Sequence, residues 1–161
     1  MIKNTTRIGY VNIENETIFE VGRFAILWNV FENTKCNNKC TCAKIVNMEK
    51  SIKNSDKEPF ERFATELKNR ANKIGRTVDK YVNNNVFPIN GAIISATDRT
   101  NYMPAVIEFI DSSGENNLAG AFLAIYRIRN NMFHGLKGHS ALDDQIDLFK
   151  AMNAVLEEVI K

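Results

Sequence analysis

The sequence has few of the residues that break or staple a polypeptide chain. Its 161 residues include only 8 glycines, 3 prolines and 3 cysteines. So little glycine and proline excludes a collagen-like chain and a low-complexity disordered one. The three cysteines, Cys36, Cys40 and Cys42, form an odd and clustered set. Such a set does not match a secreted disulfide framework and suits a reducing compartment.

Long apolar runs are missing as well. No run reaches the roughly 18 residues needed to cross a bilayer. The cationic residues Lys3 and Arg7 are not followed by the apolar stretch that is typical of a signal peptide. We therefore expect a cytoplasmic protein with no membrane partner. The composition, 44% hydrophobic and 25% charged, predicts a single globular domain over residues 1–161. A domain of this length can bury about 70% of the surface of its unfolded chain.

Neither sign of charge dominates the whole chain, but the two halves differ. The 21 basic and 19 acidic residues give a net charge of +2. Residues 1–80 hold 15 basic and 10 acidic residues, whereas residues 81–161 hold 6 and 9. This asymmetry can steer an anion toward one face, but a pair of solvated helices is the explanation that we favour.

Apolar residues recur mostly at helical spacing, and no stretch alternates convincingly as a strand does. In the first helix this spacing buries Trp28, the only tryptophan. Pro104 is expected at the first position of a helix, Gly135 just past the end of another, and Ser140 with Asp143 as a capping box. We expect helices over residues 14–33, 43–54, about 59–82, 104–110, 117–133 and from 140 to the end. The fold class predicted is all-α, a bundle of five to six helices.

A dense group of polar side chains ends the fifth of these helices. Arg129, Asn130 and His134 fall within its last two turns, where a helix end needs only a glycine and one cation. Imidazole can take a proton from a hydroxyl near neutral pH, guanidinium can hold a phosphate, and an amide can orient either partner. This set suits RNA, whose 2′-hydroxyl supplies the nucleophile. The alternative is structural, with His134 as a cation at the helix end.

The motif Arg129-Asn130-x-x-x-His134, at the end of a helix in an all-α domain, resembles the signature of the HEPN superfamily. The continuation His134-Gly135-x-Lys137 is similar to the form in several bacterial members. The resemblance covers about residues 116–160 in motif and pattern. It implies a HEPN-like fold and a metal-independent endoribonuclease with no cofactor, commonly a toxin of a toxin–antitoxin pair or an antiviral abortive-infection effector.

The resemblance also implies roles and partners. Arg129 would hold the scissile phosphate, and His134 would act on the 2′-hydroxyl or the leaving oxygen with Asn130 in support. A homodimer through the helices around residues 117–160 would join two copies of the motif, and RNA and an antitoxin protein would be the other partners. The family position for a modified tyrosine holds Leu136, which argues against regulation by that route. Some members are non-catalytic modules that bind RNA or nucleotides, which is the alternative function.

Basic residues of the middle segment form a second candidate for RNA contact. Together with Lys137, the residues that we expect to bind the RNA backbone are Arg62, Arg70, Lys73 and Arg76. Salt bridges with neighbouring acidic residues explain the same positions equally well.

Three further groups have simpler explanations. The cysteine cluster has the wrong spacing for two Cys-x-x-Cys pairs, so we expect free or transiently oxidised thiols in a loop and no metal site. His139 is expected at a helix entry. The aspartates at 143, 144 and 147 are expected to favour the positive end of a helix dipole. Phosphate-binding loops and dinucleotide fingerprints are absent from the sequence.

Overall fold

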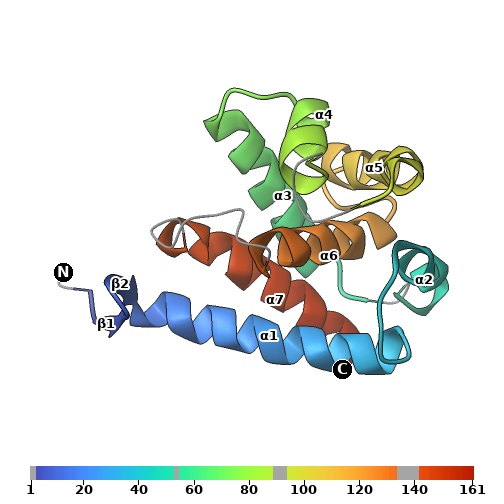
Figure 1. Ribbon diagram of the computed structural model, residues 1–161. Helices are drawn as coiled ribbons and strands as arrows, with labels where there is room; N and C mark the ends of the chain where they lie inside the picture. Colours follow the sequence, from blue (N-terminus) through green and yellow to red (C-terminus); the bar gives the residue numbers. More distant parts are fainter. Residues whose placement is uncertain (1–2, 53–54, 89–93, 134–141) are drawn as a thin grey trace.

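A computed structural model describes residues 3–52, 55–88, 94–133 and 142–161 of the chain. Within these ranges the chain is mostly helical, with seven α-helices and one two-stranded sheet (Figure 1). The expectation of an all-α class is therefore confirmed in general terms. No helix of the described ranges is long and apolar enough to cross a membrane.

The sheet is an N-terminal hairpin, which corrects the expectation that the chain has no strands. Strand β1, Thr5–Ile8, pairs antiparallel with β2, Val11–Glu14, and Gly9 in the turn has φ +61°. Glycine adopts this conformation without steric cost. All four residues of β1 are exposed, so no alternation of apolar and polar residues marks it in the sequence.

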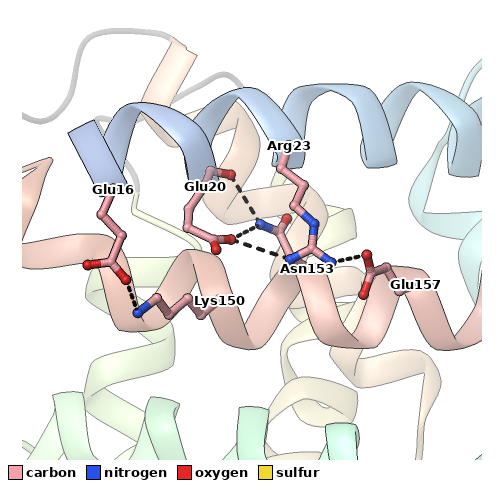
Figure 2. A network of polar contacts seen from close by, with 6 residues as sticks. All are labelled: Glu16, Glu20, Arg23, Lys150, Asn153 and Glu157. Atoms are coloured by element: carbon pink, nitrogen blue, oxygen red, sulfur yellow. Dashed lines mark hydrogen bonds and ion pairs between the residues drawn. The ribbon is translucent and has the colours of Figure 1, made fainter. Parts of the chain in front are cut away.

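Helix α1, Asn15–Lys35, lies beside α7, Ile146–Ile160 (Figure 1). Between them Phe24 packs edge-on against Phe149, with the ring centroids 5.5 Å apart. Figure 2 shows the polar contacts along the same interface, where Asn153 donates to the Glu20 carboxylate at 2.8 Å. Asn153 is fully buried, so this hydrogen bond removes much of the cost of burying its amide.

Two short helices follow the first long one, where a single short helix is expected. They are α2, Cys42–Asn47, and the 3-10 helix η1, Glu49–Ile52. Thr41 caps α2 by accepting a hydrogen bond from the Lys44 amide at 3.2 Å.

Helix α3, Glu58–Lys73, begins where expected but ends about nine residues early. Gly75 has φ +67°, and the Arg76 amide donates to the Ala71 carbonyl at 2.9 Å. These are features of a glycine-terminated helix end. The chain then turns into α4, Val78–Tyr81, and a π-helical turn η2, Val82–Val86. The expected continuous helix to residue 82 is therefore wrong.

Helix α5, Ala96–Asp111, begins eight residues before the expected start at Pro104. The Ser95 hydroxyl caps it by accepting from the Asp98 amide at 3.0 Å. Pro104 therefore lies inside the helix, where it leaves out one backbone hydrogen bond. The prediction of a proline at the first helical position is wrong because Ser95 supplies an earlier start.

Helix α6, Ala119–Phe133, matches the expected range and runs through the core. At its beginning Gly120 allows a close approach to α5, since an added Cβ would lie 2.8 Å from the Phe109 Cβ. Phe122 stacks on Phe31 of α1 with ring centroids 5.0 Å apart. The 3-10 helix η4, Asp143–Gln145, precedes α7. Ser140 of the expected capping box and the stop at Gly135 lie outside the described residues. Asp143, the other residue of that box, begins η4 and accepts a hydrogen bond from the Glu14 amide at 3.1 Å.

Candidate active site

Arg129 and Asn130 lie together in the last described turn of α6. The Arg129 guanidinium donates through Nη1 to the Asn130 Oδ1 at 2.9 Å. Both residues are half-buried. The hydrogen bond holds the guanidinium beside the amide.

Arg129 packs toward α1. Its guanidinium carbon lies 5.9 Å from the centre of the Trp28 ring, within the range of a cation–π contact. Trp28 in turn stacks on Tyr126, one turn earlier in α6, with ring centroids 6.1 Å apart. Arg129 also lines a hollow of about 100 Å³ beside Ala25, Asn29 and Glu32. The Trp28 ring, backed by Tyr126, therefore covers one side of the guanidinium, and a small space lies next to it.

His134 and Lys137, the remaining motif residues, lie outside the described residues, and so does His139. Helix α6 is described as far as Phe133, directly before His134. Of the three expected catalytic residues, Arg129 and Asn130 are therefore described and in contact, and His134 lies outside the described residues.

Sequence reasoning missed Arg127, the second arginine of the same turn. It is 2% exposed, donates through Nε to the Val86 carbonyl at 3.4 Å and through Nη2 to Asn131 Oδ1 at 3.3 Å. Its guanidinium carbon lies 5.7 Å from the centre of the Phe87 ring. Burial lowers the pKa of Arg127, although a nearby Cys42 and Tyr126 oppose this.

Asn131 completes this attachment of α6 to the η2 turn. Its amide donates to the carbonyls of Asn85 at 3.2 Å and Val86 at 3.1 Å. These carbonyls end a π-helical turn, where backbone acceptors are not all used within the helix. The adjacent Asn-Asn pair in the sequence is the signal for this role, but only the fold shows which of the two asparagines faces inward.

The basic residues expected to bind RNA fall into two places. Arg70 and Lys73, at the end of α3, line a hollow of about 250 Å³, and Arg76 donates to Asn85 Oδ1 at 2.7 Å at its edge. Arg62 lines a different hollow, next to Glu66. The expected single basic side of the helix is thus divided, with Arg70 and Lys73 as the pair that remains together.

Two of the three cysteines, which are expected as free or transiently oxidised thiols, are joined to each other. Cys36 and Cys40 form a disulfide, with their Cα atoms 4.9 Å apart, and Cys42 is buried as the first residue of α2. The helix end at residue 35 and the helix start at residue 42 bring these segments close. Because disulfides are characteristic of oxidising compartments, the argument from free thiols to a reducing one no longer applies. The cytoplasmic location stays a prediction.

Burial raises the pKa of the Cys42 thiol to about 11, with a smaller raising effect of Asp98. The thiol is therefore protonated at neutral pH and is a poor nucleophile or metal ligand. Among residues 3–52, 55–88, 94–133 and 142–161, no group of three histidine, cysteine or acidic side chains is placed to hold a metal ion.

Comparison of the chain with protein-family models, curated proteins and solved structures finds no match. The resemblance to the HEPN superfamily therefore depends on the motif at the end of α6 and on the helical architecture.

Proposed function

We propose that this protein is a metal-independent endoribonuclease of the HEPN type, acting as a toxin or an antiviral defence effector. The observation that carries the proposal is the Arg129 to Asn130 hydrogen bond of 2.9 Å in the last described turn of α6, directly before His134 in the sequence. It keeps a phosphate-binding group next to the sequence position of a general base. The other partner would be an antitoxin protein.

The proposed reaction needs no group beyond the protein and the RNA. Arg129 holds the two non-bridging oxygens of the scissile phosphate through parallel hydrogen bonds. His134 takes the proton of the 2′-hydroxyl, whose oxygen attacks the phosphorus while the bond to the 5′-oxygen breaks. The leaving 5′-oxygen takes up a proton from water, and the protonated His134 returns its proton to the solvent. The products are a 2′,3′-cyclic phosphate and a 5′-hydroxyl. Asn130 supports the reaction by orienting Arg129.

The proposal includes a homodimer, and the location of exposed apolar side chains favours a contact surface different from that expected. Most side chains of α6 and α7 are buried within one chain. The large exposed apolar residues of α1 are Phe19, 65% exposed, and Ile26, 68% exposed. Ala25 and Asn29 connect this face to the hollow that holds Arg129. A second copy bound to α1 would therefore lie near Arg129.

The test is cleavage of end-labelled single-stranded RNA and transfer RNA in excess EDTA, followed by end-group analysis. We expect cyclic phosphate ends from the parent protein and a loss of about 10² to 10⁴ in rate for His134→Ala, which is the usual contribution of a general base. His139→Ala, the same change at the only other histidine, is the matched control and should cleave normally. Thermal unfolding of both variants checks that they fold.

Equal cleavage by the parent and by His134→Ala would contradict the proposal. The second candidate function, a non-catalytic module that binds RNA or a nucleotide, would then be favoured. The observation in its favour is that Arg129 packs on Trp28, which is also what a structural arginine does.

A further inference from the structure

A hollow of about 250 Å³ lies where the ends of four helical segments meet. Its walls come from the end of α3, from α4 and η2, from the last turns of α6 and from the start of α7. At about 30 Å³ for each water molecule, it has room for roughly eight waters. This is slightly below the usual 300 Å³ of a site for a drug-sized ligand, so the hollow fits one small cyclic group.

One side of this hollow is cationic. The Arg70 side chain is 19% exposed and is held by Glu66 Oε1 at 3.3 Å and by a hydrogen bond to the Gln145 Oε1. Lys73 lies nearly one turn further along α3, is exposed and makes no ion pair within the described chain. A guanidinium held in place beside an exposed ammonium is a suitable arrangement for binding a phosphate at the entrance.

The floor of the hollow is apolar. Ile128 is 5% exposed and Leu148 is 1% exposed, and both line it together with the ring of Tyr81. Burial raises the pKa of Tyr81, so its hydroxyl keeps its proton. A flat ring placed here would be removed from water against two aliphatic side chains and one aromatic ring.

The opposite wall carries an acceptor and an amide. Asp144 of η4 lines the hollow, is exposed and makes no ion pair among the residues that the structure describes. The Asn85 amide is oriented by the hydrogen bond of 2.7 Å from Arg76 to its Oδ1. A carboxylate accepts hydrogen bonds from the exocyclic amino group of cytosine, and it repels the O4 acceptor that uracil has at the same position.

We propose that this hollow binds one nucleotide, with its phosphate at Arg70 and Lys73, its base on Ile128 and Leu148, and a cytosine amino group at Asp144. This proposal deepens the proposed function. It rests on that function only in that the bound nucleotide is taken to be an unpaired nucleotide of the RNA substrate. The hollow adjoins α6 through Asn131, which lies two residues after Arg129 and so on nearly the opposite side of the helix. A nucleotide bound here would hold the RNA strand across the width of α6 from Arg129.

The binding test uses the full chain and free 3′-CMP and 3′-UMP, measured by calorimetry and by NMR shifts of the Tyr81 ring. We expect 3′-CMP to bind about tenfold more tightly than 3′-UMP, as one added charge-assisted hydrogen bond provides. Lys73→Gln should weaken both nucleotides severalfold. Lys68→Gln removes the same charge from an exposed position of α3 outside this hollow and should leave binding unchanged.

Asp144→Asn tests the base contact. An amide can donate to uracil O4 as well as accept from cytosine N4, so the preference for 3′-CMP should fall to about one. If Asp144 only repels the phosphate, both nucleotides would instead bind more tightly with no change in preference, which would overturn the assignment of the base. Unchanged binding of both nucleotides by Lys73→Gln would overturn the assignment of the phosphate, and absence of millimolar binding would overturn the proposal as a whole.

The two proposals fail in different ways. Binding of 3′-CMP without any RNA cleavage would leave the nucleotide site standing and remove the ribonuclease. The opposite result is RNA cleavage that depends on His134, with no nucleotide binding and with equal rates for Lys73→Gln and Lys68→Gln. It would leave the ribonuclease standing and remove the nucleotide site. A short RNA with a single cytosine, compared with its uracil counterpart, distinguishes an RNA strand from a free nucleotide as the natural ligand, since only an RNA site should bind the oligonucleotide more tightly than 3′-CMP.

Discussion

Arg127 and Arg129 leave the same turn of α6 on nearly opposite sides, because two residues rotate a helix by about 200°. Arg127 is enclosed by the Val86 carbonyl, the Asn131 amide and the Phe87 ring. Arg129 is half-buried, contacts Asn130 and Trp28, and faces a small hollow. One side of the helix end therefore attaches to the core, and the other keeps a cation near solvent.

The comparison separates a structural arginine from a candidate catalytic one. A guanidinium that binds a phosphate must keep its hydrogen-bond donors within reach of a ligand, whereas one that fastens two segments can be closed off. The buried arginine also holds the turn that carries Asn85, at the edge of the hollow described above. The two sides are linked because a shift of α6 would move both.

The largest expected effect is on stability, from Arg127→Ala. The change leaves a cavity and removes a donor from the buried Val86 carbonyl. We expect a loss of about 3 to 5 kcal/mol in the free energy of unfolding. Urea denaturation measures it. Arg127→Met keeps most of the volume and removes the cost of burying a charge, so it should cost clearly less. A loss below about 0.5 kcal/mol for Arg127→Ala would contradict the structural role.

Arg129→Ala should show the reverse pattern. Loss of a cation–π contact at a half-exposed site costs about 1 kcal/mol of stability. RNA cleavage should fall about 10² to 10³-fold, as for the removal of other donors that stabilise a transition state. Arg129→Lys keeps the charge but not the two parallel hydrogen bonds, so it should restore little activity. Full cleavage by Arg129→Ala, or a stability loss equal to that of Arg127→Ala, would remove the distinction between the two arginines.

The range of α1 could be predicted to within two residues from its helical spacing, but its buried face only in part. Trp28 and Phe31 lie in the core as that spacing predicts, whereas Ala25 of the same predicted face is exposed and Phe24 is buried instead. The end of α3 was missed because Ile74 and Val78 continue the helical spacing through Gly75. Ile74 is 49% exposed, so its apolar side chain does not mark a buried face. Here turn chemistry outweighs periodicity.

The site could be predicted only in part. Arg129 and Asn130 are consecutive in the sequence, so their proximity is a local property. The burial of Arg127 depends on Val86, 41 residues earlier in the chain, and the hollow requires four segments to converge. Such long-range contacts leave no periodic trace in a single sequence.

The smallest expected effect concerns Cys42, on the same side of α6 as Arg127 rather than Arg129. Burial raises its pKa from 9.0 to about 11. Between pH 9 and 11 the folded chain therefore keeps a proton that the unfolded chain has lost, so stability falls as pH rises through this range. The slope from one proton is at most about 1.4 kcal/mol per pH unit.

Urea unfolding at pH 8 and pH 10, compared between the parent and Cys42→Ala, measures this contribution. The free energy of unfolding should change less between pH 8 and pH 10 in the variant than in the parent, and the difference is the contribution of the Cys42 thiol. Labelling of native protein with a thiol reagent should be slow at pH 8, because a thiol with a pKa of about 11 is almost entirely protonated there. Rapid labelling with an apparent pKa near 9 would mean that the thiol is accessible, and that the attachment of α6 at Arg127 is looser than its hydrogen bonds imply.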